Sequence, residues 1–555
     1  CKPIKNEKNI YWINRAQLEF LIAQSRGEIR QGKWQKGIES ARQANEKAKD
    51  LAKVAQFAPD EAEKQWTKIA ILQASMELAT SQILAGVFSE AEWTLRETYT
   101  QSKELGLVGS PFMNGFFNRV AMFYNTIGSY NEAMKFSQQT ETNLLDQGYQ
   151  KGSPVWMFSR MQTHESLIGL NNWTEVWDSF QVASSEAARI GKPLAGMQLQ
   201  SLLRTFTAIK INRNDIALRI QQAQMVWLTN NFGEDHYFTA INRGLMAVAL
   251  WKTGDAERAK KEFERASRKL TAPDTLTGDF IESALQQKIK RFVLQSYMQL
   301  LAQTAHLYAS DAETIFQIAD QLNVSKVQQA LSDAAIRSGV SSDGMSEIIR
   351  KEQDAKNEAS FITNYISGQG ATEGGRRNPE VVKQMIQRLR ELENQRRQYK
   401  ADIQKNFPEY FQLIQPKSPT TAEISKQLLP DELFLSIVPL EDVIYIWAID
   451  SNGKVKFHTS NLSEGELKGL VRKVRDTLDV AGLGARAPRF DVASAYALYK
   501  EILQPFEQQM KNSGHLIVAT SGQLAQIPFA VLPRTPDLNE DRKSTRLNSS
   551  HANIS

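Results

Sequence analysis

The feature that most constrains the fold is a repeat of about 42 residues in the first half of the chain. Six segments open with Gly or Asn, mostly carry an aromatic residue two positions later, and place a small or apolar residue at the sixth position. The segments begin at Gly32, Gly86, Gly128, Asn171, Asn212 and Gly254, and their sixth residues are Gly37, Ala91, Ala133, Val176, Ala217 and Ala259. Successive sixth residues are 54, 42, 43, 41 and 42 positions apart, so the first period carries an insertion. A fixed period of this length predicts a stack of similar structural units.

The residue types in the repeat predict that each unit is a pair of helices. Gly and Asn tolerate the left-handed backbone that a tight turn between two helices requires. The small sixth residue lets the second helix of a pair pack closely against the first. Apolar residues such as Phe117, Val120 and Tyr124 have helical spacing. Gly followed two residues later by Pro, as at 109–111 and 152–154, marks the end of one pair and the start of the next.

These helix pairs resemble tetratricopeptide (TPR) repeats in the longer-period form common in bacterial proteins. The resemblance is carried best by Gly128, Tyr130 and Ala133 and by the stretch from Trp251 to Ala259, and it covers about residues 20–270. It implies a mostly α-helical superhelix, which we expect over residues 1–340, whose concave face binds a protein or peptide partner. Asn118, Arg160 and Arg243 precede their turns by 10, 11 and 11 residues, where a first-helix side chain could face the groove. They are the predicted partner-binding residues; the alternative is an ordinary packed or solvated side chain.

Residues 341–415 are predicted to form a long antiparallel helical arm. Its helices run over 342–366 and 379–404, with Asn378 as the N-cap of the second and Pro379 in its first turn. The link 367–378 is rich in glycine, but no strand precedes it and no Lys-Ser/Thr follows it, so a flexible connection is favoured over a phosphate-binding loop.

The periodicity changes after Pro419, and residues 420–540 are predicted to begin an α/β domain. The sequence DSNG at 450–453 joins two β-rich runs as a hairpin, and Ser463 with Glu466 forms a capping box. The expected elements are strands at 432–439, 442–450 and 454–458, helices from Ser463 and over 492–511, and a strand at 516–519.

This half-domain resembles the N-terminal part of a CHAT domain, the caspase-like cysteine-peptidase module found next to TPR arrays. The matching positions are Leu498, Tyr499, Leu503, Pro505, Gly522, Leu524, Pro528, Phe529 and Leu532, with Pro408, Tyr410 and Pro416 in the preceding run. The expected fold is therefore mostly α, a repeat superhelix with a helical arm, followed by an incomplete α/β caspase-like domain.

The resemblance implies a Cys/His dyad in a cysteine endopeptidase, but neither residue can be assigned in this chain. The only cysteine is Cys1, and the family's His stands in a His-Gly pair, whereas His515 is followed by Leu516. His458 lies in the predicted hairpin. We expect no catalytic residue, no cofactor and no metal site here. The alternative to a peptidase parent is a non-catalytic TPR scaffold or signalling adaptor with a degenerate CHAT domain.

Residues 541–555 do not resemble natural protein sequence. Asp541 to His551 back-translates into a run that resembles a sequencing adapter read in one frame, so this tail is expected to be non-native; a natural polar tail is the alternative.

Charge and cysteine content limit the remaining possibilities. The whole chain has 67 Lys+Arg against 62 Asp+Glu, which gives no electrostatic reason to expect a nucleic-acid partner. No apolar run approaches the roughly 20 residues that span a bilayer. Cys1 marks either the edge of a fragment or the lipidated first residue of a bacterial lipoprotein. A cytoplasmic location is favoured, with membrane anchoring through Cys1 as the alternative.

Overall fold

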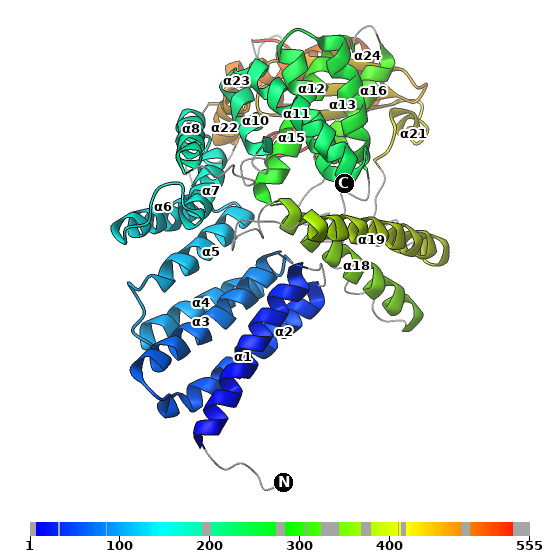
Figure 1. Ribbon diagram of the computed structural model, residues 1–555. Helices are drawn as coiled ribbons and strands as arrows, with labels where there is room; N and C mark the ends of the chain where they lie inside the picture. Colours follow the sequence, from blue (N-terminus) through cyan, green and yellow to red (C-terminus); the bar gives the residue numbers. More distant parts are fainter. Residues whose placement is uncertain are drawn as a thin grey trace. The chain divides into compact units, whose positions relative to one another are not determined.

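The computed structural model describes residues 7–30, 34–84, 86–190, 201–272, 283–305, 308–322, 343–367, 379–408, 410–411, 418–478 and 489–536. Cys1, Gly32, Asn378, the link from 368 to 378 and the tail 541–555 therefore lie outside the described residues. The chain divides into two compact units. The repeat unit comprises Cys1–Leu294 and Leu331–Gln415, and the sheet unit comprises Gln295–Ala330 and Pro416–Ser555. The chain is mostly helical with one small mixed sheet, as predicted (Figure 1).

The repeat unit is built from consecutive helix pairs, each with a first helix, a turn and a second helix. The first three pairs are α1 (Glu7–Arg30) with α2 (Trp34–Lys53), α3 (Glu61–Leu84) with α4 (Phe88–Glu104), and α5 (Phe112–Ile127) with α6 (Tyr130–Asp146). The next three are α7 (Pro154–Gly169) with α8 (Trp173–Arg189), α10 (Ser201–Lys210) with α11 (Asn214–Phe232), and α12 (Tyr237–Lys252) with α13 (Ala256–Leu270). The longer first period is taken up by the short helix η1 (Ala55–Phe57) and by the 24-residue α3.

The predicted turn chemistry is confirmed wherever the turn is described. Gly86, Gly128, Asn171, Asn212 and Gly254 all have positive φ angles, the region that Gly and Asn tolerate best. The small sixth residues are all buried, which confirms that each allows the second helix of its pair to pack closely.

The aromatic residue two positions after a turn packs on the next pair. Tyr130 lies against Gly169 at the end of α7, where a side chain would collide with its ring. Trp173 meets Phe206 of α10 edge-on, with ring centroids 5.4 Å apart. The repeat motif therefore contains both the contact within a pair and the contact between pairs.

Replacing Ala133 with leucine tests this register. Ala133 is fully buried, so the larger side chain should overpack the helix pair and cost about 1–3 kcal/mol. The change should lower the melting temperature measured by circular dichroism at 222 nm. Lys135→Leu, two residues further on an exposed face, is the matched control and should leave it nearly unchanged. Equal tolerance at both positions would mean that the helix pairing is different.

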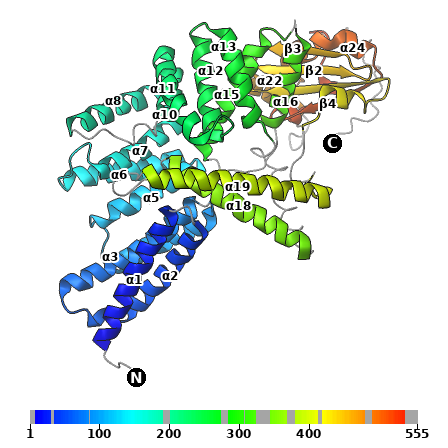
Figure 2. The ribbon, with the colours of Figure 1, turned by 45° about the vertical axis from the view of Figure 1, so that its right-hand side comes forward.

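The predicted arm consists of α18 (Asp343–Ser367) and α19 (Pro379–Asn406), which pair in antiparallel orientation (Figures 1 and 2). Arg388 of α19 donates to Glu358 of α18 at 2.7 and 2.9 Å. Two turns further along α19, Arg396 donates to Glu352 at 3.0 and 2.6 Å. Both side chains of this second pair are mostly buried, at 8% and 15% exposed, so it is a buried ion pair. On its other side α18 packs on α2 and α3, through a cluster that includes Phe361 and Leu78.

The sheet unit contains a four-stranded sheet with the order β3-β2-β1-β4. Its strands are β1 (Glu432–Pro439), β2 (Ile444–Asp450), β3 (Val455–Ser460) and β4 (His515–Thr520). The first three are antiparallel neighbours, whereas β4 runs parallel to β1 and ends the order on that side. The predicted hairpin is confirmed, since Asp450 Oδ1 accepts bonds from the amides of Asn452 and Lys454 at 3.0 and 2.9 Å.

Helices cover both faces of the central strand β2. One face packs on α22 (Glu464–Leu478) and α23 (Val492–Ile502). The other packs on α16 (Ala309–Leu322), where the ring of Trp447 meets Phe316 and its Nε1 donates to the carbonyl of Ala312 at 3.1 Å. The segment 295–330, which falls within the predicted repeat range 1–340, thus groups with the sheet.

One predicted helix is wrong in its extent. The single helix expected over 492–511 is divided into α23, the short helix η3 (Gln504–Phe506) and α24 (Glu507–Lys511). Pro505 lies at the division, because its ring clashes with the preceding turn and it has no amide proton to donate. The small elements α21 (Thr421–Ser425), η4 (Leu524–Gln526) and η5 (Phe529–Val531) complete the sheet unit.

Candidate functional site

The three predicted partner-binding residues lie on first helices of the repeat unit, Asn118 on α5, Arg160 on α7 and Arg243 on α12. The structure does not bring them together into one cluster. Arg160 and Arg243 are each engaged within their own part of the repeats, as the following contacts show.

Arg160 lies between the two second helices that flank α7. Its guanidinium pairs with Glu141 of α6 at 2.5 Å and donates to Ser179 of α8 at 3.2 Å. It also lies over the ring of Trp156, 4.8 Å from the centroid. These contacts connect three helices, and they leave about a fifth of the side chain exposed, at 21%.

Arg243 is more deeply buried, with 6% of its side chain exposed. It donates to Glu262 of α13 at 2.7 Å and also pairs with Glu234 in the turn before α12. Asn118 is almost fully buried, and its Oδ1 accepts no hydrogen bond in the described part of the chain. Arg160 and Arg243 therefore connect helices within the repeats, and a role of the three residues in contacting a partner stays a prediction.

The sequence did not predict that a helix of the chain lies against several repeats at once. The first half of α15 (Ala284–Ala302) belongs to the repeat unit and contacts four successive helix pairs. Ala284 lies against the turn at Gly128, and Phe292 meets Phe206 edge-on with centroids 5.1 Å apart. Val293 packs where Gly244 of α12 has no side chain.

Lys288 fixes the centre of this contact. Its ammonium donates to the carbonyls of Ile168 and Gly169, both at 3.0 Å, and to Asn171 Oδ1 at 2.7 Å. These carbonyls end α7, so a positive charge there also complements the helix dipole. One sequence signal was available: apolar residues fall on more than one side of this segment, which is typical of a helix that other elements cover on more than one side.

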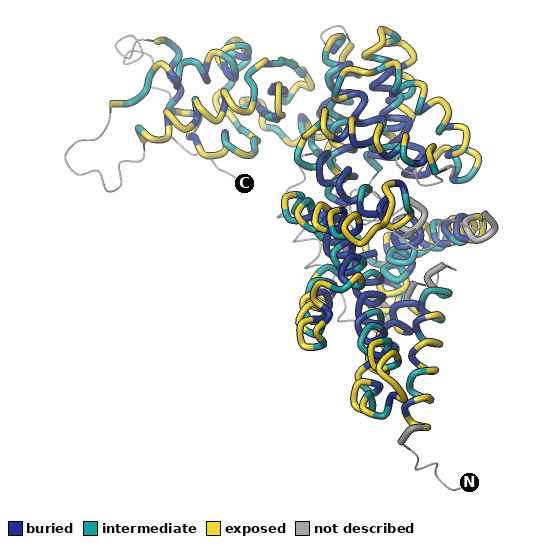
Figure 3. Tube along the Cα trace, turned by 60° about the vertical axis from the view of Figure 1, so that its left-hand side comes forward, coloured by how far each residue is buried: buried dark blue, intermediate teal, exposed yellow. Residues whose placement is uncertain are grey.

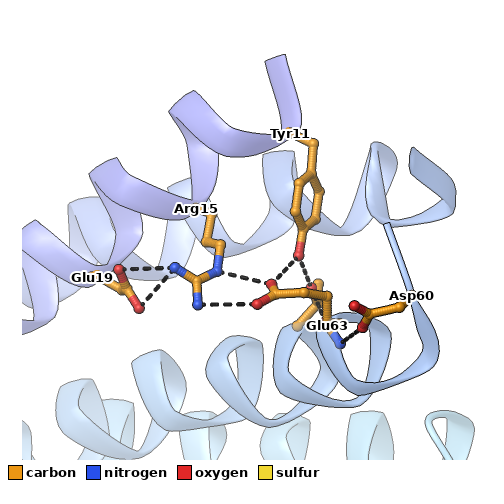
Figure 4. A network of polar contacts seen from close by, with 6 residues as sticks. Tyr11, Arg15, Glu19, Asp60 and Glu63 are labelled. Atoms are coloured by element: carbon orange, nitrogen blue, oxygen red, sulfur yellow. Dashed lines mark hydrogen bonds and ion pairs between the residues drawn. The ribbon is translucent and has the colours of Figure 1, made fainter. Parts of the chain in front are cut away.

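A polar network joins α1 of the first pair to α3 of the second pair (Figure 4). Arg15 donates to both carboxylate oxygens of Glu63, at 2.9 and 3.3 Å, and bonds Glu19 one turn along α1. The hydroxyl of Tyr11 donates to Glu63 Oε2 at 2.9 Å. Burial, as the largest cause, raises the pKa of Tyr11. These contacts fix the rotation of α1 about its own axis. The side chains on the side of α1 away from α3 therefore point away from the repeats.

The pKa values of two groups on or beside first helices, the partly buried Glu165 and the buried His236, shift in opposite directions. Burial raises the pKa of Glu165 on α7 to about 7. Burial, with smaller contributions from Lys269 and Arg390, lowers the pKa of His236 to about 3. His236 caps α12, because its Nδ1 accepts a bond from the amide of Phe238 at 3.1 Å, which requires the neutral ring.

His236 predicts a loss of stability in acid. Its folded pKa of about 3 lies below the ordinary 6.5, so the unfolded chain binds the proton more readily. This stabilising contribution is complete above pH 6.5 and is lost between 6.5 and 3, by at most about 1.4 kcal/mol per pH unit. His236→Asn keeps a capping side chain without the titration and should flatten the dependence in urea unfolding from pH 7 to about 5. Identical slopes for the two proteins would contradict this assignment.

The two histidines in the described part of the sheet unit lie in different settings. His515 is exposed, and its Nδ1 lies 2.9 Å from Asp431 Oδ2, at the beginning of β4. His458 on β3 is half-buried near Phe506, and burial lowers its pKa. Among the described residues, no group of His, Cys, Asp and Glu side chains could hold a metal ion. None of the described helices is both long enough and apolar enough to cross a membrane.

No protein-family model matches the sequence, and a search of curated proteins found nothing similar.

Proposed function

We propose that the chain is part of a TPR-CHAT protein, in which the repeats bind a protein partner and the complete CHAT domain is a caspase-like cysteine endopeptidase. The observation that carries this proposal is the combination of two compact units. One contains stacked helix pairs with the predicted turn chemistry, and the other contains a mixed sheet in which β4 runs parallel to β1.

The residues that carry the resemblance support the proposal, because several of them have structural roles in the sheet unit. Leu498, Tyr499 and Leu524 are buried in its core, and Gly522 has a positive φ of 65° in the turn after β4. Residues with such roles are restricted in type, which explains why this pattern is recognisable.

Activity in the proposed parent would require residues outside the described half-domain. The resemblance implies a thiolate nucleophile that a His activates and an oxyanion that backbone amides stabilise. The single cysteine of this chain is Cys1, so the chain as it stands is expected to be inactive.

The alternative is a scaffold with a degenerate CHAT domain. His515 does not decide between the two proposals, because it is exposed and paired with Asp431 at the start of β4, and it is not the His of the family's His-Gly pair. The two proposals make different predictions for a parent protein that continues beyond Leu538.

The experiment compares iodoacetamide labelling and casein cleavage by this chain and by the parent protein. We expect no cleavage by this chain and no labelled residue between 420 and 536. The parent should gain a labelled cysteine, and cleavage should disappear when that cysteine is replaced by alanine. A parent that has the Cys and His but cleaves no protein, even with its partner present, would favour the scaffold.

A further inference from the structure

The outer side of α1 exposes an unusually apolar stripe, which we call the α1 outer face and define by Ile13, Ala16, Phe20 and Ala23. All four residues are exposed, with Ile13 at 49% and Phe20 at 65%. Figure 3 shows exposed positions along the helices nearest the N-terminus. Their spacing of three, four and three residues places them on one side of the helix. Exposed apolar patches of this kind mark interaction sites more often than isolated apolar residues do.

The repeat register indicates what this face is built to contact. Phe20 lies 12 positions before the turn residue Gly32. The residues at the same distance before the turns at Gly86, Gly128, Asn171 and Gly254 are Ala74, Phe116, Ser159 and Asn242, and all four are buried.

In these four pairs, the second helix of the preceding pair covers this position. Phe116 stacks on Tyr99 of α4 with centroids 6.0 Å apart. Ser159 donates to the carbonyl of Ser137 of α6 at 3.0 Å, and Asn242 Oδ1 accepts from Gln221 of α11 at 3.0 Å. Ala74 belongs to the same core cluster as residues of α2. Position 20 on α1 is therefore the place where another helix docks.

The sizes of the side chains on the α1 outer face indicate which helix can dock there. Large and small residues alternate in the order Ile13, Ala16, Phe20, Ala23, so the stripe is complementary to itself when two copies run antiparallel. Phe20 of one copy then lies opposite Ala16 of the other, and Ile13 lies opposite Ala23. Such an arrangement is two-fold symmetric, with its axis near position 18.

Charge does not oppose this pairing. Among the exposed residues of α1 between 9 and 23, only Glu19 is charged, and it pairs with Arg15 on the same helix. Two such faces can therefore meet without placing unpaired like charges opposite one another.

We propose that two copies of this chain associate through the α1 outer face as an antiparallel helix pair. This inference does not depend on the proposed peptidase relationship. One helix pair is smaller than a standard protein interface of about 800 Å² per partner, so the dimer should be weak, with a Kd on the order of micromolar.

Sedimentation velocity of the full chain between about 1 and 100 µM tests the proposal. The expected result is a monomer that converts to a dimer as the concentration rises. Phe20→Glu should raise the Kd at least about tenfold, because a charge would be buried in the interface. Trp93→Glu is the matched control, since Trp93 is 61% exposed on α4, away from the face, and should leave the dimer intact.

A size-swap tests the antiparallel register. Ala16→Phe alone should weaken the dimer, because two large side chains would meet. The double variant Ala16→Phe with Phe20→Ala should restore it, because large again lies opposite small. A monomer at every concentration would overturn the proposal. So would a dimer that Phe20→Glu does not weaken, or one that Ala16→Phe strengthens.

Discussion

Replacing Arg243 with alanine should lower the free energy of unfolding of the repeat unit by about 3 kcal/mol. The side chain of Arg243 is 6% exposed and forms ion pairs with two carboxylates, those of Glu262 on α13 and Glu234 before α12. Removing it leaves Glu262, whose side chain is mostly buried, without its buried cationic partner. The cost of an uncompensated buried charge exceeds the net value of the ion pair itself.

The matched control for this change is Arg258→Ala. Arg258 lies on α13 and forms an exposed pair with Asp255 one turn earlier, so its loss should cost less than about 0.5 kcal/mol. Urea unfolding followed at 222 nm compares the two variants. Equal midpoints would contradict the structural role of Arg243, and the residue could then be tested as a direct partner contact.

Replacing Trp447 with alanine should destabilise the sheet unit by about 3–5 kcal/mol. The side chain is fully buried between β2 and α16, where it contacts Phe316 and Phe457. The change removes this packing and leaves the carbonyl of Ala312 without the bond from the indole.

Hydrogen exchange of β1 and β2, read by mass spectrometry, measures this effect directly. Exchange should accelerate strongly in the variant. Leu429→Ala, at a residue 60% exposed just before β1, is the control and should exchange like the natural chain. Unchanged protection in Trp447→Ala would show that α16 does not hold this face of the sheet.

The sequence predicted the features whose causes are local. A turn between helices needs a residue that tolerates positive φ, and Gly128 and Asn171 supply it within their own repeat. The hairpin at Asp450 and the capping box at Ser463 likewise depend on residues within a few positions.

Features that depend on distant contacts could not be predicted. Lys288 lies 117 positions from Asn171, and no local pattern connects them. The packing of α16 on Trp447 joins residues 135 positions apart. Arg160 and Arg243 stood at plausible groove positions, but their partners Glu141 and Glu262 come from neighbouring second helices. Spacing alone does not distinguish a side chain that pairs with other residues of the repeats from one that contacts a partner protein.

The most direct test of the proposed TPR-CHAT relationship is the sequence of the parent gene beyond the codon for Leu538. We predict a reading frame that supplies a His-Gly pair after one further strand and a cysteine after the next. A frame that continues through comparable strands without the His-Gly pair, or without the cysteine, would contradict the proposed peptidase function. The non-catalytic scaffold would then be the remaining proposal.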